Sequence, residues 1–483
     1  RPPPSRSCVE TGSTMLRYAA VGAALLCCAA PSQAFSPTGV VLRSSQLRSA
    51  VSTASPTLRT AMERRSVGAS LLMTATKGSD TIEVNQVLEE NTERTASPPI
   101  QPTEKMIEDV AWIIPEDDME LKDRVDMYVE KGELTEADRF ILMNWFDNYK
   151  EALSSAQARP DYPYTSKFSV DAHFTTLVEL VRKERNRPHY FNKAKETGTC
   201  YEPRNAHASD SRFFDYHQFG VDFTRPLVDW PNCKIVGMDN LNKIKQQLAD
   251  GDNVVFLSNH QSESDTHCIF TLFQDQLGPE FGALAQDIVF MAGERVLRDA
   301  IVVPFSRGCN LLTVYSKKHI DSEPELKPAK MQHNQRSMKQ LGALFAKGGT
   351  CMWYAPSGGR DRRDPETGKV EPAMFDPNAI EMVRLVAEAA GAGAKTHMYP
   401  MALATHNIFP PPATVGGAFG EERRVQFSQL SVAICDEVVD KPIDKSLEGM
   451  EARKAVKQLR VDRTKLAYAE MLEGYAAIGG YDQ

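Results

Sequence analysis

The alternation of short apolar runs with helical patterns after about Thr197 most constrains the fold. The apolar runs read NVVFLS, DIVFMAG, TCMWYAP, MYPMALA and RVQFSQLSVAI, and amphipathic segments such as NQRSMKQLGALFAKGG and AIEMVRLVAEAAGAG lie between them. This alternation is typical of an α/β domain. We therefore expect residues 197–483 to form a larger α/β domain with a mixed, largely parallel sheet. In such sheets ligands bind outside the carboxyl ends of the strands, so the residues after each run are the candidates for chemistry.

Residues 103–196 have a helical pattern instead. Thr135 is placed to cap a helix over ELTEADRFILMNWFDNYKEALSSA, and VDAHFTTLVELVRKER repeats the amphipathic pattern. The expected apolar faces are Phe140, Met143, Phe146 and Tyr149 in the first segment, and Phe174, Leu177, Val178 and Val181 in the second. We expect this region to be a helical bundle domain in front of the α/β domain.

The first 78 residues have the composition of a targeting sequence. From Met15 a basic start, an apolar stretch and a small-residue site form a signal-peptide pattern. Between Met15 and Gly78 seven basic residues stand against one acidic residue, which is typical of a transit peptide. This two-part presequence resembles that of algae with secondary plastids and predicts the plastid stroma. A secreted protein with a disordered linker is the alternative. Residues 79–102 are polar and predict a tether.

The charge balance excludes some classes of protein. The net charge is −8, and without residues 1–78 the chain has 47 basic and 62 acidic side chains, a net of −15. Such an acidic chain argues against broad binding to nucleic acid. The nine cysteines form no C-x-x-C pair and no Cys/His cluster with zinc spacing, so we expect no metal. After the presequence no run of 18 apolar residues occurs, so we expect at most peripheral membrane contact.

The sequence NHQSESD follows the first apolar run and contains His260 and Asp265. Positions five apart do not face each other on a continuous helix. We therefore expect the histidine on a turn and the aspartate in the first turn of a helix capped by Ser262 or Ser264. Asp265 can then orient one ring nitrogen while the other takes a proton, as in general-base catalysis. A surface turn would also fit this pair taken alone, and His267 is expected to be an ordinary helix residue.

Two other strand ends gather cationic side chains. VYSKKH contains Lys318 and His319, and SGGRDR contains Arg360 and Arg362. Paired glycines let the backbone turn closely, and arginine offers fork-shaped donors that suit phosphate. Each cation alone would also fit a solvated loop. Four of them in an acidic chain predict an anion-binding site.

The motifs NHQSESD, AGERVL, VYSKKH, APSGGRDR and YPMALATHNIFPPP resemble, in order and context, those of the plastid glycerol-3-phosphate acyltransferases. The resemblance covers roughly residues 110–440. The His-x4-Asp box is common to glycerolipid acyltransferases, and SGGRDR points to the soluble plastid branch. The main departure from the family pattern is Glu263-Ser264 inside the box.

This resemblance implies transfer of an acyl group from acyl carrier protein, or acyl-CoA, to the sn-1 hydroxyl of glycerol 3-phosphate, the first step of plastid glycerolipid synthesis. No bound cofactor is implied. The roles carried over are His260 as the base, Asp265 as its partner, and Lys318, His319, Arg360 and Arg362 as phosphate ligands. Two alternatives are a lysophosphatidate acyltransferase and a non-enzymatic acyl-carrier or lipid-binding protein. The SGGRDR box weighs against the first, and the intact His–Asp pair weighs against the second.

Overall fold

The structure is a computed structural model. It describes residues 115, 117–162, 168–185, 201–202, 214–316, 320–321, 323–391, 393–412, 422–440, 442, 444 and 446–483. The predicted presequence and tether lie outside the described residues, and so do Lys318 and His319.

Three helices precede the α/β part of the chain: α6 (Leu121–Glu130), α7 (Glu136–Gln157) and α8 (Val170–Arg185). The predicted start of α7 is confirmed. Thr135 Oγ1 accepts a hydrogen bond from the Asp138 amide at 3.1 Å, and Asp138 Oδ2 accepts one from the Thr135 amide at 2.9 Å. This reciprocal pair is a capping box, which satisfies amides that have no partner inside the helix.

The predicted apolar face is confirmed for α8 but wrong at one position of α7. All four predicted residues of α8 are fully buried. In α7 Phe146 and Tyr149 are buried, whereas Phe140 is 63% exposed. Each step of three residues falls about 60° short of a full turn in a helix of about 3.6 residues per turn, so a run at this spacing winds around the helix. Trp145 takes part in the buried face instead.

Eight strands of the described chain form one sheet in the order β1-β5-β4-β6-β3-β7-β8-β2. Their bounds are β1 Tyr201–Glu202, β2 Ile235–Val236, β3 Asn253–Ser258, β4 Val289–Gly293, β5 Asn310–Val314, β6 Cys351–Tyr354, β7 Thr396–Ala404 and β8 Ser431–Ile434. The pairs β1–β5 and β7–β8 are antiparallel, and the other neighbours are parallel. The prediction of a mixed, largely parallel sheet is confirmed.

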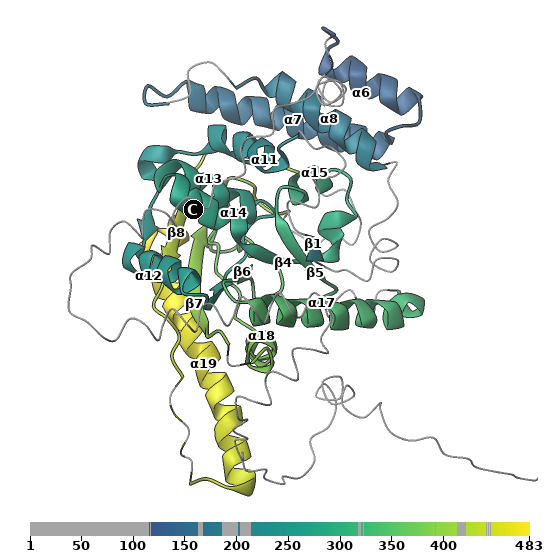
Figure 1. Ribbon diagram of the computed structural model, residues 1–483. Coiled ribbons are helices and arrows are strands. Elements are labelled where there is room, and N and C mark those ends of the chain that lie inside the picture. Colours follow the sequence, from purple (N-terminus) through teal and green to yellow (C-terminus); the bar gives the residue numbers. More distant parts are fainter. Residues whose placement is uncertain are drawn as a thin grey trace, which may run out of the picture. The chain divides into compact units, whose positions relative to one another are not determined.

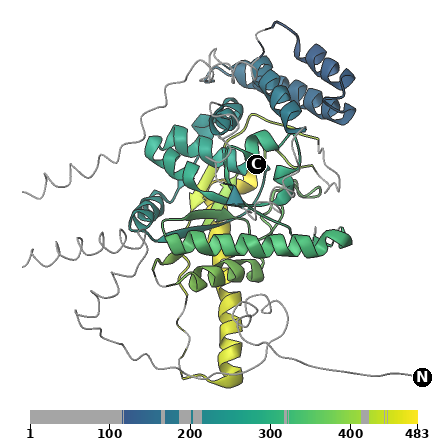
Figure 2. The ribbon, with the colours of Figure 1, turned by 45° about the vertical axis from the view of Figure 1, so that its right-hand side comes forward.

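Helices cover both faces of this sheet (Figure 1). The helices of this part are α11 Tyr216–Thr224, α12 Met238–Ala249, α13 Asp265–Gln276, α14 Pro279–Asp287, α15 Val303–Ser306, α17 Lys327–Lys347, α18 Pro377–Ala389 and α19 Gly449–Ala477. Short 3-10 turns span Arg225–Leu227, Trp230–Asn232, Glu294–Leu297, Pro324–Leu326 and Gly480–Asp482. Helices α17 and α18 lie on one side of the sheet, and α13 and α14 lie on the other (Figure 2).

The central strand β3 shows why a strand with helices on both faces has an apolar sequence. All six of its residues are buried. Phe256 packs into the apolar cluster that includes α13, whereas Val255 and Leu257 pack into the cluster that includes α17, α18 and α19. Successive side chains of a strand point to opposite faces, so a strand covered on both faces reads as a continuous apolar run.

The N-terminal helices share the first of these clusters. The Trp145 ring of α7 lies 5.1 Å from the Phe223 ring of α11 and 5.9 Å from the Phe305 ring of α15. The apolar packing is therefore continuous between the three helices and the α/β part. The domain boundary at residue 196 stays a prediction.

The strand order fixes where the candidate chemistry lies. Strand β3 is flanked by β6 and β7, and both are parallel to it. The carboxyl ends of these three strands therefore meet at one edge of the sheet. The segments that follow Ser258, Tyr354 and Ala404 begin there.

Candidate active site

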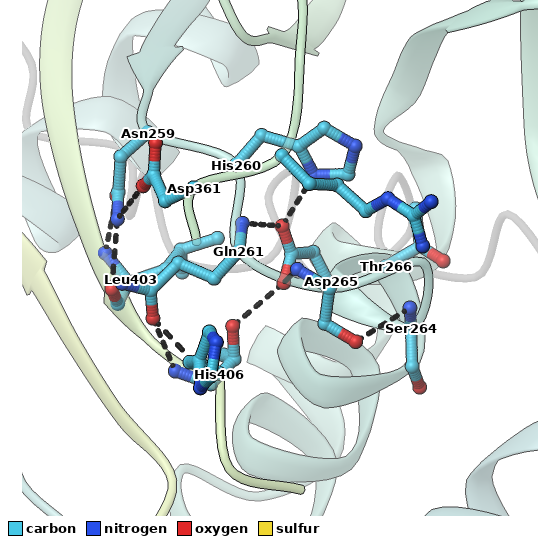
Figure 3. Close-up of polar contacts among 12 residues, drawn as sticks. Asn259, His260, Gln261, Ser264, Asp265, Thr266, Asp361, Leu403 and His406 are labelled. Carbon is cyan, nitrogen blue, oxygen red and sulfur yellow. Dashed lines mark hydrogen bonds and ion pairs between the residues drawn. The ribbon is translucent and has the colours of Figure 1, made fainter. Parts of the chain in front are cut away.

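His260 and Asp265 lie together just beyond the carboxyl end of β3 (Figure 3). His260 Nδ1 is 2.7 Å from Asp265 Oδ2. The histidine side chain is 29% exposed, whereas that of the aspartate is 3% exposed. In the tautomer whose Nδ1 donates its proton to this carboxylate, Nε2 is the acceptor nitrogen of the ring. This arrangement suits a general base with an orienting acid.

Four donors fix the Asp265 carboxylate. Besides the histidine, Oδ2 accepts from the Gln261 amide at 2.9 Å, and Oδ1 accepts from the Ser262 amide at 3.0 Å. Thr405, the first residue after β7, donates its hydroxyl to Oδ1 at 2.6 Å. Ser264 is the N-cap residue of α13, as expected, but its side chain makes no cap bond; Ser262 Oγ instead accepts from the Ser264 amide at 3.0 Å. Asp265 accepts from the amides three and four positions before it, which holds the turn closed around the histidine.

Two amide side chains hold this turn against the end of β7. Asn259 Oδ1 accepts from the Leu403 amide at 2.8 Å, and its Nδ2 donates to the Leu403 carbonyl at 3.0 Å. Gln261 Oε1 accepts from the Thr405 amide at 2.8 Å, and its Nε2 donates to the Tyr475 hydroxyl at 2.8 Å. Both neighbours of the histidine are thus hydrogen-bonded to the end of β7. Gln261 is also bonded to the last turn of α19.

The turn after β6 brings the predicted arginines next to this site. The backbone amide of Asp361 donates to the His260 carbonyl at 2.6 Å. Arg362 donates to the Pro412 carbonyl at 3.1 Å and to the Arg360 carbonyl at 3.0 Å. Arg360 lines a pocket whose wall also includes Pro412. The structure therefore brings four of the six predicted site residues together at one edge of the sheet.

The unusual Glu263 of the box has a partner in the structure. Its Oε1 accepts from Arg423 Nε at 2.8 Å, and Arg423 Nη2 donates to Asp299 Oδ2 at 3.1 Å. The guanidinium also lies over the Trp145 ring, 5.7 Å from its centroid. A buried cation needs compensating charge. Glu263 supplies part of that charge on the wall of the same pocket that Arg360 lines.

His267 plays no part in this arrangement. It lies in α13, 4% exposed, and burial together with the neighbouring His217 lowers its pKa to about 3. The expectation of an ordinary helix residue is confirmed.

Asp361 is a site residue that we did not predict from the sequence. It is 2% exposed, and its carboxylate accepts from the Ala373 amide at 2.9 Å and from Asn259 Nδ2 at 3.4 Å. Its pKa is raised to about 7, chiefly by burial and also by the charge of Asp265, which together outweigh the lowering effects of its two hydrogen bonds and of Arg362. Its place between two arginines that follow a predicted strand is the signal that could have found it.

This raised pKa predicts how stability depends on pH. Between about pH 4 and about pH 7 the folded state holds a proton that the unfolded state releases, so the free energy of unfolding falls as pH rises. The full shift corresponds to a loss on the order of 4 kcal/mol across that window. Asp361→Asn cannot ionise. We therefore expect the free energy of unfolding of Asp361→Asn, relative to that of wild type, to be higher at about pH 8 than at about pH 5. Urea unfolding at the two pH values measures this difference.

Asp364→Asn is the control for this measurement, because the exposed Asp364 lies in the same loop. Hydrogen bonds from backbone amides lower the pKa of the Asp364 carboxyl. The stability of Asp364→Asn relative to wild type should therefore not improve between about pH 5 and about pH 8. A stability difference between Asp361→Asn and wild type that stays constant with pH would show that Asp361 titrates normally.

Part of the chain is similar to a known protein family. Residues 233–404 match the family model described as Acyltransferase, and this segment contains the His260–Asp265 pair and the arginine turn. This part of the chain, with its α/β fold, is therefore similar to acyltransferases. Among the described residues we find no helix long and apolar enough to cross a bilayer.

The similarity extends to particular curated proteins, all named as chloroplastic glycerol-3-phosphate acyltransferases. The Arabidopsis thaliana protein is 36% identical over 313 residues, which are 64% of this chain and 63% of the relative. The Spinacia oleracea protein is 39% identical over 242 residues, half of each chain. The Pisum sativum protein is 34% identical over 269 residues, 56% of each chain. The matched segment therefore spans 50–63% of the length of these relatives. These similarities confirm the resemblance found in the motifs.

Proposed function

We propose that this chain transfers an acyl group from a thioester to the sn-1 hydroxyl of glycerol 3-phosphate. The observation that carries the proposal is the hydrogen bond from the Asp361 amide to the His260 carbonyl, 2.6 Å long. It joins the turn with the candidate phosphate ligands directly to the candidate base. The names of the relatives give the same acceptor.

The His260–Asp265 pair supplies the proton chemistry in this proposal. His260 Nε2 takes the proton of the acceptor hydroxyl as its oxygen attacks the thioester carbonyl. The tetrahedral intermediate then collapses, the carbon–sulfur bond breaks, and the imidazolium returns the proton to the leaving thiolate. Asp265, 2.7 Å from Nδ1, keeps the ring in the required tautomer and stabilises the imidazolium.

The cationic side chains position the acceptor. Arg360 and Arg362 bind its phosphate in the proposal, together with Lys318 and His319, the two residues outside the described chain. Holding the phosphate places the hydroxyl against Nε2, and such positioning lowers the barrier by removing the entropy cost of a two-body encounter. We further propose acyl carrier protein as the acyl donor.

A product assay tests this function. The purified protein is given glycerol 3-phosphate and acyl carrier protein loaded with a labelled chain, and the products are identified by mass spectrometry. We expect 1-acyl-glycerol 3-phosphate and free carrier thiol. Acylation of lysophosphatidate alone would instead favour a lysophosphatidate acyltransferase. Tight acyl binding without thiol release would favour a carrier.

We also propose that residues 1–78 direct the chain to the plastid stroma, which agrees with the chloroplastic relatives. Residues 15–78 fused to a fluorescent reporter should deliver it to the stroma, and Phe35→Ala should strand it outside the plastid. Microscopy with a stromal marker checks the result. A secreted or cytosolic reporter would contradict the proposal.

A further inference from the structure

Asp361 lies at the junction between the two halves of the proposed site. On either side of it in the chain are Arg360 and Arg362, which the proposed function assigns to the phosphate. Its backbone contacts His260, which the proposed function assigns to the hydroxyl. We propose that Asp361 is a positioning residue that sets the distance between the phosphate-binding arginines and the base. This inference rests on the proposed function and adds a residue to its machinery.

The backbone contact links the two halves without an intermediate. The Asp361 amide donates to the His260 carbonyl at 2.6 Å, although the residues are 101 positions apart in the sequence. A shift of this turn therefore moves the arginines relative to the imidazole. A displacement of about 1 Å in such a site can cost about a hundredfold in rate.

The side chain fixes where that amide lies. The carboxylate accepts from the Ala373 amide at 2.9 Å and from Asn259 Nδ2 at 3.4 Å. Asn259 is itself held by two hydrogen bonds to the backbone of Leu403 in β7. Asp361 thus connects the turn after β6 to the ends of β3 and β7 (Figure 3).

The burial of the Asp361 carboxyl costs folding free energy, so its place in the site calls for a reason other than stability. The side chain is 2% exposed. Its partners are a backbone amide and a neutral side chain, although arginines stand on both sides of it in the sequence. A buried carboxyl held by neutral donors destabilises a fold. Its presence at the contact between the two halves points to positioning rather than to stability.

Asp361→Asn tests the inference because it keeps the size of the side chain. The new amide can still accept from Ala373, but its NH₂ group then faces the NH₂ group of Asn259, which Leu403 holds in place. Two donors repel, so the turn shifts. We expect kcat/KM for glycerol 3-phosphate to fall by about 10- to 100-fold, mainly through kcat, because the arginines still bind the phosphate but hold the hydroxyl away from the base.

The readout compares three acceptors in one reaction series: glycerol 3-phosphate, glycerol, and water. Labelled acyl carrier protein gives acyl-glycerol phosphate, monoacylglycerol or free fatty acid, respectively. Glycerol and water have no phosphate for the arginines to hold. Their rates in Asp361→Asn should therefore change by less than about threefold, since only the positioning of the phosphate is lost.

Two further variants separate positioning from folding. Asp364→Asn makes the same chemical change at an exposed position of the same loop and should leave all three rates unchanged. In an Arg360→Ala background the added effect of Asp361→Asn should shrink to less than about threefold, because residues that act together are not additive. Circular dichroism and thermal unfolding confirm that each variant is folded.

The outcomes are distinguishable. Equal losses with all three acceptors, or full additivity with Arg360→Ala, would overturn the positioning role while wild-type acylation of glycerol 3-phosphate leaves the proposed function standing. Unchanged kinetics in Asp361→Asn would do the same. A wild-type protein that does not prefer glycerol 3-phosphate over glycerol would overturn both proposals.

Discussion

Replacing His260 with alanine is expected to lower kcat for acyl transfer by at least about 10²–10⁴-fold, the usual contribution of a positioned general base. The imidazole is part exposed and hydrogen-bonded to Asp265, so its loss removes the proton acceptor and leaves the core intact. The measurement is kcat at saturating donor and acceptor, together with thermal unfolding. Substantial turnover by a folded His260→Ala protein would contradict the mechanism.

His397→Ala is a matched control. His397 also lies between carboxylates, with Nδ1 2.6 Å from Glu437 Oε1 and Nε2 3.0 Å from Asp252 Oδ2. It stands at the amino-terminal end of β7, away from the edge where the carboxyl ends of the parallel strands meet. We expect this variant to lose stability but to keep its kcat per folded molecule.

Asp265→Asn tests the orienting acid. The four donors that surround this carboxylate require an acceptor on both oxygens. An amide must turn its NH₂ group toward some of them, which displaces the imidazole or forces its other tautomer. We expect kcat to fall by up to about 10⁴-fold, as in hydrolase triads, with little change in KM for the acceptor. A rise in KM alone would show that Asp265 binds substrate instead.

The second large effect is expected from Arg360→Ala, which should raise KM for glycerol 3-phosphate by about 10- to 150-fold. A hydrogen bond to a charged group is worth about 1.5–3 kcal/mol, and about 1.4 kcal/mol is a factor of ten. KM for the acyl donor should change much less, and Arg360→Lys should restore binding only in part because the fork geometry is lost. Initial-rate kinetics with each substrate varied in turn measures the difference.

Variants of two neighbouring arginines show whether the increase in KM is specific to Arg360. Arg363→Ala is the control: Arg363 is exposed and its guanidinium binds the Gly368 and Gln483 carbonyls and Asn407. Arg362→Ala should also raise KM for the acceptor, but it removes bonds to the Pro412 and Arg360 carbonyls and so should loosen the turn as well. Equal increases in KM for both substrates in Arg360→Ala would mean that the phosphate binds elsewhere.

Local patterns in the sequence were sufficient for several features whose interacting groups are close in the chain, though not for the side-chain cap of α13. The apolar runs predicted strands β3, β4, β6 and β7, because a strand buried on both faces must be apolar throughout. Thr135 predicted the start of α7, since a cap and its amides lie within one turn. The turn that joins His260 to Asp265 was likewise predictable, because five residues span it.

The tertiary structure alone decided how this turn is held and what stands beside it. Thr405 reaches Asp265, and Asp361 reaches His260, across 140 and 101 positions of sequence. These contacts depend on the strand order β6-β3-β7, which local periodicity does not encode. Phe140 is exposed for a related reason: which side of a helix is buried depends on what packs against it, and the spacing of apolar residues gives only a choice of faces.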